Sequence, residues 1–170
     1  MILIHTALLC EAIYLIEKLK LKKKTNDIFL SKDIIVAISK VGKKDTIKMV
    51  EYIYKNYDIS KAINIGVAGT NSQDVNIGDI FCVNKQLDDM DFMPLITKDS
   101  IVLQEQIVNP TATLYDMEGG YFYNISSRYL VDDDIYIFKI VSDFLDKKKL
   151  DKDFVKNLIK QNYQTIKNYF

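Results

Sequence analysis

Three acidic residues stand far apart in the sequence, each beside an apolar or small-residue stretch. Glu11 follows the apolar run at the start of the chain, Glu118 precedes two glycines, and Asp143 ends another apolar run. Carboxyl groups in such positions can bind the hydroxyls of a sugar, hold a water molecule or donate a proton. Because open α/β sheets bind their ligands where strands end, we expect the three side chains to share one site.

Two of these acids suggest specific roles from their local sequence. Glu118 lies in the segment Tyr115–Gly120, and its carboxylate can accept two hydrogen bonds from the adjacent hydroxyls of a sugar. Asp143 ends the run Ile140–Asp143, where partial desolvation favours the protonated form that a general acid requires.

Each acid also has a purely structural interpretation. Taken alone, Glu11 is more typical of a first-turn charge that interacts favourably with the helix dipole, because acidic first turns are common. Glu118 is equally typical of an acidic helix start in which the glycines allow close packing, and Asp143 of a residue that caps the next segment. Taken one at a time, the three residues leave both interpretations open.

A small-residue loop and a lone histidine are less informative. The glycine pair of Gly66–Gly69, followed by Asn76–Asp79, would let backbone approach a ligand closely, although a tight turn explains it equally well. It lacks the third glycine of a dinucleotide-binding fingerprint. His5 is the only histidine, and we expect it to be a buried strand residue, since no partner for a metal site or a catalytic triad accompanies it.

The spacing of apolar residues predicts alternating strands and helices. Strands are expected at residues 1–6, 28–30, 34–38, 62–65, 80–83, 101–108, 112–115 and 135–141. Helices are expected at residues 8–19, 44–57, 117–130 and 151–170. Residues 84–100 are expected to be irregular, and Asn109-Pro110 to separate two of the strands. This order predicts one domain over residues 1–170, a three-layer αβα fold with a mixed, largely parallel twisted sheet.

Composition narrows the class of protein. Lys plus Arg and Asp plus Glu both number 23, so the net charge is zero and no overall field favours nucleic acid or a membrane as partner. Cys10 and Cys82 lie in apolar segments, which favours buried free thiols over a disulfide or a metal site. The chain starts on a strand-like run that does not resemble a signal peptide, so we expect a cytoplasmic protein. We also expect no metal and no cofactor. The 11 tyrosines make a self-association face plausible, and ordinary packing explains them equally well.

Together these features resemble the purine nucleoside phosphorylase superfamily, especially its nucleosidase branch, which includes 5′-methylthioadenosine/S-adenosylhomocysteine nucleosidase and futalosine hydrolase. The segments that carry the resemblance occur in the family's order: Ala7–Ala12, Ser39–Lys43, Asn64–Gly69 with Ile77–Asp79, Asp116–Gly119 and Lys139–Asp143.

The resemblance implies a division of roles around a purine nucleoside. Asp143 would donate a proton or hydrogen bond to N7 of the leaving base, Glu118 would bind the ribose hydroxyls, and Glu11 would position or deprotonate the attacking water. Ser142 would orient Asp143. The remaining residues that the resemblance implies at the substrate are Met117, Val67, Ala68 and Gly69.

The chain also departs from the family pattern. It is shortened between Val83 and Asp116, the part that in relatives supplies an aromatic residue stacked on the base; Phe92 and Phe144 are candidates for that role. Lys40 stands where the family has a glycine. Arg128 is the only arginine, and ten residues of helix would turn it away from Glu118, which favours water over phosphate as nucleophile.

We therefore expect an N-ribosyl hydrolase. A phosphate-dependent phosphorylase and a nucleoside-binding protein without turnover remain the alternatives, because a fold alone does not establish an activity.

Overall fold

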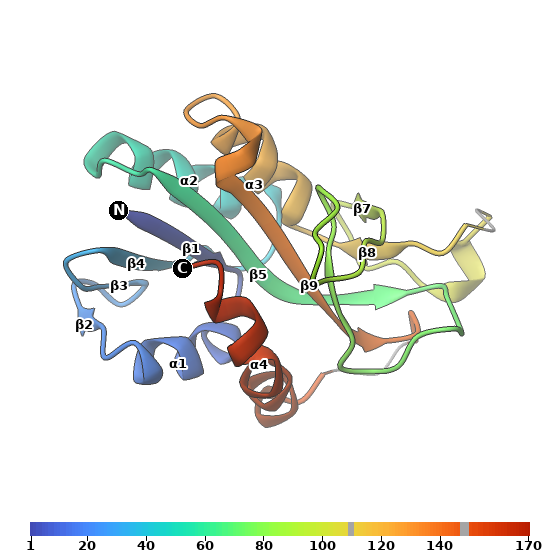
Figure 1. Ribbon diagram of the computed structural model, residues 1–170. Helices are drawn as coiled ribbons and strands as arrows, with labels where there is room; N and C mark the ends of the chain where they lie inside the picture. Colours follow the sequence, from blue (N-terminus) through green and yellow to red (C-terminus); the bar gives the residue numbers. More distant parts are fainter. Residues whose placement is uncertain (109–110, 147–149) are drawn as a thin grey trace.

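The structure is a computed structural model that describes residues 1–108, 111–146 and 150–170. Its described strands form one mixed sheet (Figure 1): β1 (Ile2–Thr6), β2 (Lys22–Lys23), β3 (Ile28–Leu30), β4 (Ile34–Ile38), β5 (Lys61–Thr70), β6 (Ile80–Cys82), β7 (Leu95–Thr97), β8 (Leu114–Asp116) and β9 (Ile135–Asp143). The described helices are α1 (Leu9–Lys18), α2 (Lys43–Asn56), α3 (Gly119–Ser126) and α4 (Lys152–Lys167).

The helices cover both faces of the sheet (Figure 1). The α1 and α4 helices lie on one face, where Leu15 and Ile159 are fully buried against strand residues such as Ile63. The α2 and α3 helices lie on the other face, where Val50 and Phe122 are fully buried. Each helix therefore buries one apolar side, as its periodicity predicts. The predicted three-layer αβα fold is confirmed.

The centre of the sheet is parallel, and its margins are antiparallel except for β7, which pairs with β8 in parallel. Parallel ladders join β4 to β1, β1 to β5 and β5 to β9. Antiparallel ladders attach β2 and β3 at one margin, and β6 and β8 at the other end. Short turns join the antiparallel strands β2, β3 and β4, whereas helices separate the central parallel strands in the sequence, with α1 after β1, α2 between β4 and β5, and α3 before β9.

Strand β5 changes partner along one of its edges, and this change makes room for a site. The β1 strand pairs with β5 as far as Asn64, and β8 pairs with the same edge from Gly69 onward. Strand β9 occupies the opposite edge throughout. Among the described strands, residues 65–68 therefore have no partner on the β1/β8 edge, so their backbone groups can bind side chains or a ligand.

Several expected boundaries are wrong. Residues 101–108 are not a strand; they contain a 3-10 turn at Gln104–Gln106, in which the Gln106 side chain accepts a hydrogen bond from the Leu103 backbone N–H. The strand beside β8 is instead β7, within the segment expected to be irregular. Residues 109 and 110, expected to divide two strands, lie outside the described residues.

The helix expected at residues 117–130 is shorter, because it begins only at Gly119 and ends at Ser126. The Asp116 side chain accepts a hydrogen bond from the Gly119 N–H, and this bond fixes the start of the helix. Strand β5, expected at residues 62–65, continues to Thr70 because β9 pairs with it almost to its end.

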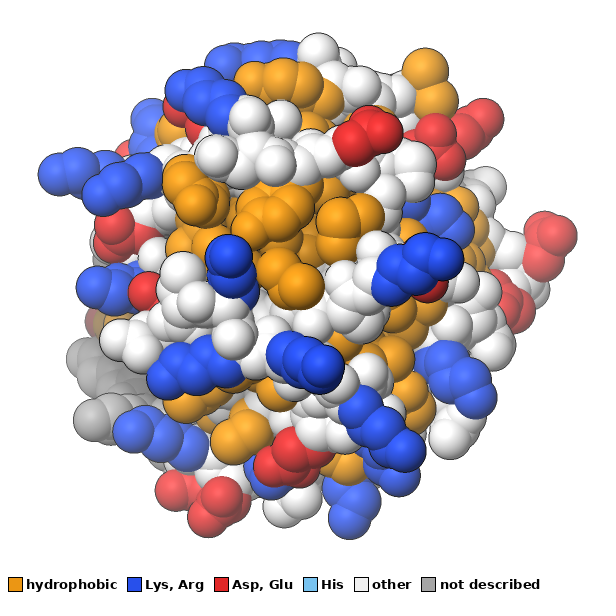
Figure 2. Space-filling view, turned by 90° about the vertical axis from the view of Figure 1, so that its left-hand side faces the viewer, with side chains coloured by type: hydrophobic (Ala, Val, Ile, Leu, Met, Phe, Trp, Pro, Cys, Tyr) orange, Lys and Arg blue, Asp and Glu red, His pale blue; other side chains and the backbone are white. Residues whose placement is uncertain are grey.

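Lysines gather at the end of the sheet where β1 begins. Figure 2 faces this end and shows lysine side chains around a hydrophobic area. Residues 1–61 contain twelve lysines and seven acidic residues, so the charges of this neutral chain are segregated along the sequence. No helix of the described residues is long and apolar enough to cross a bilayer.

Candidate active site

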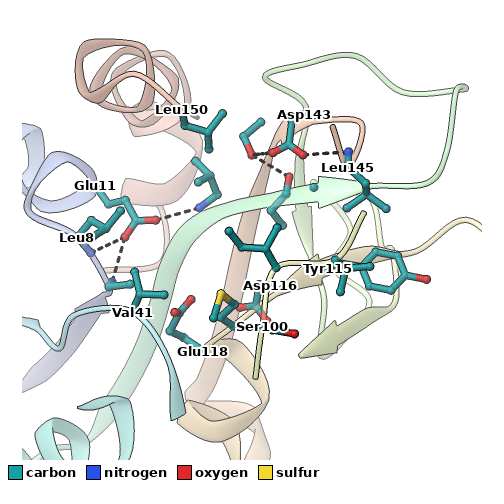
Figure 3. Close-up of a pocket in the computed structure, with 18 residues that line it drawn as sticks. Leu8, Glu11, Val41, Ser100, Tyr115, Asp116, Glu118, Asp143, Leu145 and Leu150 are labelled. Atoms are coloured by element: carbon teal, nitrogen blue, oxygen red, sulfur yellow. Dashed lines mark hydrogen bonds between the residues drawn. The ribbon is translucent and has the colours of Figure 1, made fainter. Parts of the chain in front are cut away.

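A cavity of about 220 Å³ opens beside the unpaired edge of β5. Its wall is formed by residues of β5, β8 and β9, by the start of α1, and by the loops that follow β1, β4, β7, β8 and β9 (Figure 3). All eight residues that the sequence singles out line this cavity: Glu11, Val67, Ala68, Gly69, Met117, Glu118, Ser142 and Asp143. The structure thus brings together residues that are up to 132 positions apart, while their roles remain predictions.

Glu11 turns back onto the start of its own helix. Its Oε2 accepts hydrogen bonds from the backbone N–H groups of Ala7 (3.0 Å) and Leu8 (2.9 Å), and its Oε1 accepts one from Val67 (3.2 Å) on the unpaired edge of β5. Burial raises the pKa of Glu11, although these N–H donors and Lys139 oppose the shift. The carboxylate therefore caps the start of α1 and also lines the cavity. The structural interpretation of Glu11 as a first-turn charge is thus compatible with a role in the site.

Glu118 occupies the residue before α3 and is 8% exposed. Its Oε1 accepts a hydrogen bond of 2.8 Å from the Gly42 N–H, which holds the loop before α2 against the cavity. Burial raises the pKa of Glu118 to about 7; Asp116 and Glu11 also raise it, whereas Lys139 and the Gly42 N–H lower it. This carboxyl group changes charge near neutral pH.

Lys139 is a buried cation that the sequence analysis did not single out. Its side chain is 2% exposed, and its Nζ lies 2.7 Å from Oδ2 of Asp116. Burial opposes the charged form of Lys139, but Asp116, Glu118 and Glu11 together raise its pKa. The signal was present in the sequence, because a lysine within the apolar run of β9 must find a buried partner.

Asp116 completes this group of ionised side chains. Burial alone would raise the pKa of Asp116, but Lys139, Thr97 and the Gly119 N–H together outweigh burial and lower it. A Cβ atom on Gly66 would lie 3.0 Å from Oε1 of Glu11 and 3.2 Å from Nζ of Lys139, so a larger residue there would force these two side chains to shift. We call Glu11, Asp116, Glu118 and Lys139 the Lys139 side of the cavity.

Asp143 lies across the cavity from this group (Figure 3). Its Oδ2 accepts a hydrogen bond of 2.7 Å from the Ser142 hydroxyl, and its Oδ1 accepts one of 2.9 Å from the Leu145 N–H. Leu145 and Tyr115 flank Asp143, and Gly69 of β5 lies beneath it. We call Gly69, Tyr115, Asp143 and Leu145 the Asp143 side of the cavity.

The two aromatic residues considered for base stacking, Phe92 and Phe144, lie outside the wall that the described residues form around this cavity. Phe92 lines a separate hollow near β6, and Phe144 one beside α4. Tyr115 is the aromatic residue in the wall, and the loop residues beside it are Ile101 and Val102. The sequence did not single out Tyr115 for this role, because residues 84–108 follow no regular pattern from which the neighbours of the site could be derived.

Arg128 and His5 lie away from the cavity wall. An Arg128 guanidinium nitrogen is 3.8 Å from a Glu51 carboxylate oxygen, on the outer side of α3. Burial lowers the pKa of His5 to about 3, and its ring stacks on Phe122 at 5.3 Å, so this histidine is a neutral core residue as expected. No group of metal-binding side chains occurs within the described parts of the chain.

Comparison with solved structures identifies the fold. The 5′-methylthioadenosine/S-adenosylhomocysteine nucleosidase of Streptococcus pneumoniae, with the transition-state inhibitor MT-ImmA, matches with a TM-score of 0.81 and 15% identity over 99% of this chain and 97% of that chain. Futalosine hydrolase of Helicobacter pylori matches with a TM-score of 0.80 and 16% identity over 99% and 96%.

The Campylobacter jejuni methylthioadenosine/adenosylhomocysteine nucleosidase matches with a TM-score of 0.77 and 18% identity over 99% and 97%. No protein-family model matches the chain, and a comparison with curated protein sequences finds no match. The chain therefore has the fold of these nucleosidases, as the sequence resemblance implied. Its activity is a separate question, because one fold can carry several functions.

Proposed function

We propose that this protein is an N-ribosyl hydrolase that cleaves the bond between base and ribose in a purine nucleoside, such as methylthioadenosine or adenosylhomocysteine. The observation that carries this proposal is that Glu11, Glu118 and Asp143, from three distant segments, line one cavity. Solved neighbours with the same fold are nucleosidases for these compounds, which supports the same class of substrate.

Asp143 is the proposed proton donor to the leaving base. It faces the cavity from the end of β9, and the Ser142 hydroxyl and the Leu145 N–H fix the orientation of its carboxyl group. A proton or hydrogen bond delivered to N7 lowers the charge that the base must carry away, and a fixed donor supplies it without reorganisation.

Glu118 is the proposed partner of the ribose hydroxyls. As the bond to the base breaks, positive charge develops on the sugar, and a nearby carboxylate stabilises it. Because the pKa of Glu118 is raised to about 7, its negative charge is fully present only above that pH. The proposal therefore predicts that the rate of cleavage rises as the pH increases through about 7.

Glu11 is the proposed base for the attacking water. Burial raises its pKa, which makes its carboxylate a better proton acceptor near neutral pH. Lys139 acts from beneath, where its ammonium group balances the charge of Asp116 and limits the repulsion between Glu11 and Glu118. Lys139 is thus a positioning residue in this proposal.

Water is favoured over phosphate by the charge of the wall. Four carboxyl groups line the cavity: Glu11, Asp116, Glu118 and Asp143. No arginine or lysine is among the described residues that line the cavity, so a phosphate dianion would lack a cationic partner in the wall, whereas a neutral water molecule needs none. The same wall suits the cationic sugar that forms during cleavage.

A panel of nucleosides tests this proposal. Purified protein is incubated with methylthioadenosine, adenosylhomocysteine, adenosine, inosine and futalosine, with and without phosphate, and released base and sugar are quantified. We expect free base and free ribosyl product without phosphate. Formation of ribose 1-phosphate only when phosphate is added would instead support the phosphorylase alternative.

The matched control is Asp143→Asn. The asparagine oxygen can accept from the Leu145 N–H and its amide can face the Ser142 hydroxyl, so the fold should be retained. Turnover should fall by about 10²- to 10⁴-fold, the usual effect of removing a general acid. If no nucleoside is cleaved but one of them raises the melting temperature, the protein is a nucleoside-binding protein without turnover.

A further inference from the structure

Leu145 has an unusual backbone conformation at the edge of the cavity. Its φ is 59°, in the left-handed region that disfavours residues with a branched side chain. Two hydrogen bonds hold it there: its N–H donates to Oδ1 of Asp143 at 2.9 Å, and its carbonyl accepts from the Gln104 N–H at 3.0 Å. The surrounding structure therefore fixes a conformation that the residue would not adopt by itself.

The result of this conformation is that the Leu145 side chain lies over β5. A Cβ atom built on Gly69 would be 2.5 Å from Cδ2 of Leu145 and 2.8 Å from Oδ1 of Asp143. The leucine methyl group and the carboxylate thus share the space above Gly69 (Figure 3). Leu145 is only 4% exposed, so the side chain is packed in the wall and does not extend into solvent.

The space that remains is small for a nucleoside. The cavity volume is about 220 Å³, whereas pockets for drug-sized ligands usually measure about 300–1,000 Å³. Much of the rest of the wall is fixed, because Glu11, Glu118 and Lys139 are held by hydrogen bonds and charge. Leu145 is a wall residue next to Asp143 whose shortening would enlarge the cavity without removing a polar group.

We propose that Leu145 is a specificity-determining residue that limits the size of the base beside Asp143. This inference rests on the proposed function, since it assumes that the leaving base binds against Asp143. In that orientation the purine substituents nearest to N7 are those at C8, the carbon bonded to N7, and at C6, the carbon one bond beyond C5. Leu145 excludes bases with larger groups at these positions and accepts those with small ones.

Binding of free bases tests this inference without requiring turnover. The probes are adenine, 8-aminoadenine and 6-dimethylaminopurine, and their affinities for the whole chain are measured by isothermal titration calorimetry. The Leu145→Ala variant should bind at least one of the two enlarged bases about 10- to 200-fold more tightly relative to adenine than the unchanged protein does. The proposal would also be supported if the alanine variant binds adenine and the unchanged protein does not.

Two further variants separate side-chain size from backbone strain. Leu145→Gly also removes the side chain, and it relieves the left-handed strain. It should therefore show the same change in the ratio of affinities, and it can replace Leu145→Ala if the alanine variant folds poorly. Leu145→Asn keeps a side chain of similar size and tolerates a positive φ, so its ratio of affinities should match that of the unchanged protein.

Equal ratios in the unchanged protein and in the alanine and glycine variants would overturn the proposal, as would the absence of base binding in all of them. The nucleoside panel decides the proposed function independently. Cleavage of a nucleoside together with unchanged ratios would reject the role of Leu145 and leave the hydrolase intact. Altered ratios without any cleavage would support Leu145 as a size filter in a binding protein.

Discussion

The Lys139 side and the Asp143 side of the cavity contrast in how their charged groups are held. On the Lys139 side, three carboxyl groups and a fully buried ammonium group lie in the layer between strands and helices. On the Asp143 side, a single half-buried carboxyl group at the end of β9 is held by its neighbour Ser142 and by Leu145 in the loop that follows. The first arrangement depends on the whole fold, the second on a few local contacts.

This difference indicates which residues of the site can be substituted at a small cost in stability. Charges buried together cannot be changed singly without leaving a partner uncompensated. A local loop can change its side chains at a small cost in stability, because few other residues depend on it. We therefore expect the charged residues of the Lys139 side, where the sugar is proposed to bind, to be constrained by folding. The choice of base is expected to depend on residues of the Asp143 side, such as Leu145.

The largest effect on stability should come from Lys139→Met. Methionine matches the length of the lysine chain but leaves Asp116 as a buried carboxylate without its ammonium partner, 2.7 Å away in the unchanged protein. Breaking a buried ion pair in this way usually costs about 3–5 kcal/mol. Urea denaturation at pH 7 measures the free energy of unfolding.

Two controls make the Lys139 prediction specific. The double variant Lys139→Met with Asp116→Asn should recover part of the loss, because it removes the uncompensated charge. Asp143→Asn, on the other side of the cavity, should leave the stability almost unchanged. A loss of less than about 1 kcal/mol in Lys139→Met would mean that the two sides do not differ as described.

The next effect is a pH dependence caused by Glu118. Its pKa is about 7 in the folded protein and 4.5 for an unperturbed group, so between these values the folded state binds a proton that the unfolded state has released. The contribution of Glu118 to stability is therefore fully present below pH 4.5 and is lost as the pH rises through about 7. The full difference is up to about 3 kcal/mol at about 1.4 kcal/mol per pKa unit.

Glu118→Gln removes this pH dependence, because the amide stays neutral while its oxygen can still accept from the Gly42 N–H. Melting curves of both proteins at pH 5 and pH 8 should show that the variant gains relative stability at the higher pH. The reverse trend, with the variant losing ground at pH 8, would contradict the raised pKa of Glu118.

Much of this arrangement follows from sequence patterns, and the exceptions have physical causes. Strands such as β4 and helices such as α2 were predicted within one residue or two, since their apolar periodicity is regular. The sequence could predict which residues near strand ends line one cavity, because acidic side chains beside apolar runs stand out there. Lys139 was missed because its partner Asp116 lies on another strand, and Leu145 because tertiary hydrogen bonds impose its conformation.

A smaller effect on stability is expected for Glu11→Gln. Both carboxylate oxygens accept backbone N–H groups, from Ala7 and Leu8 on one oxygen and from Val67 on the other. A glutamine amide must point its NH₂ group at one of these donors, which leaves a buried N–H without an acceptor at a cost of about 1–3 kcal/mol. Asp143→Asn, in contrast, forces no such mismatch.

The assay for Glu11→Gln combines a melting curve with cleavage of the best nucleoside of the panel. Loss of both stability and turnover supports a carboxylate that is part of the scaffold and of the chemistry. Retention of full turnover would remove Glu11 from the proposed mechanism, whatever happens to the melting temperature.

The smallest effect is expected at Lys40, which stands beside the Lys139 side in the loop before α2. Its φ is 75°, and its side chain is exposed. A left-handed backbone conformation costs an ordinary residue about 1–2 kcal/mol. Glycine avoids this cost, but part of the gain is cancelled because glycine loses more conformational entropy when the chain folds. Lys40→Gly should therefore stabilise the protein by about 1 kcal/mol or less and raise the melting temperature by about 2–4 °C.

Lys32→Gly is the matched control for Lys40→Gly, because it removes the same charge from an exposed lysine whose φ is not positive. It should lower the melting temperature or leave it unchanged. If both glycine variants shift stability in the same direction, the effect at Lys40 comes from charge or chain entropy. If only Lys40→Gly is stabilising, the loop that donates the Gly42 N–H to Glu118 contains backbone strain. This strain would then lower the stability on the Lys139 side of the cavity, where the charged groups are most tightly held.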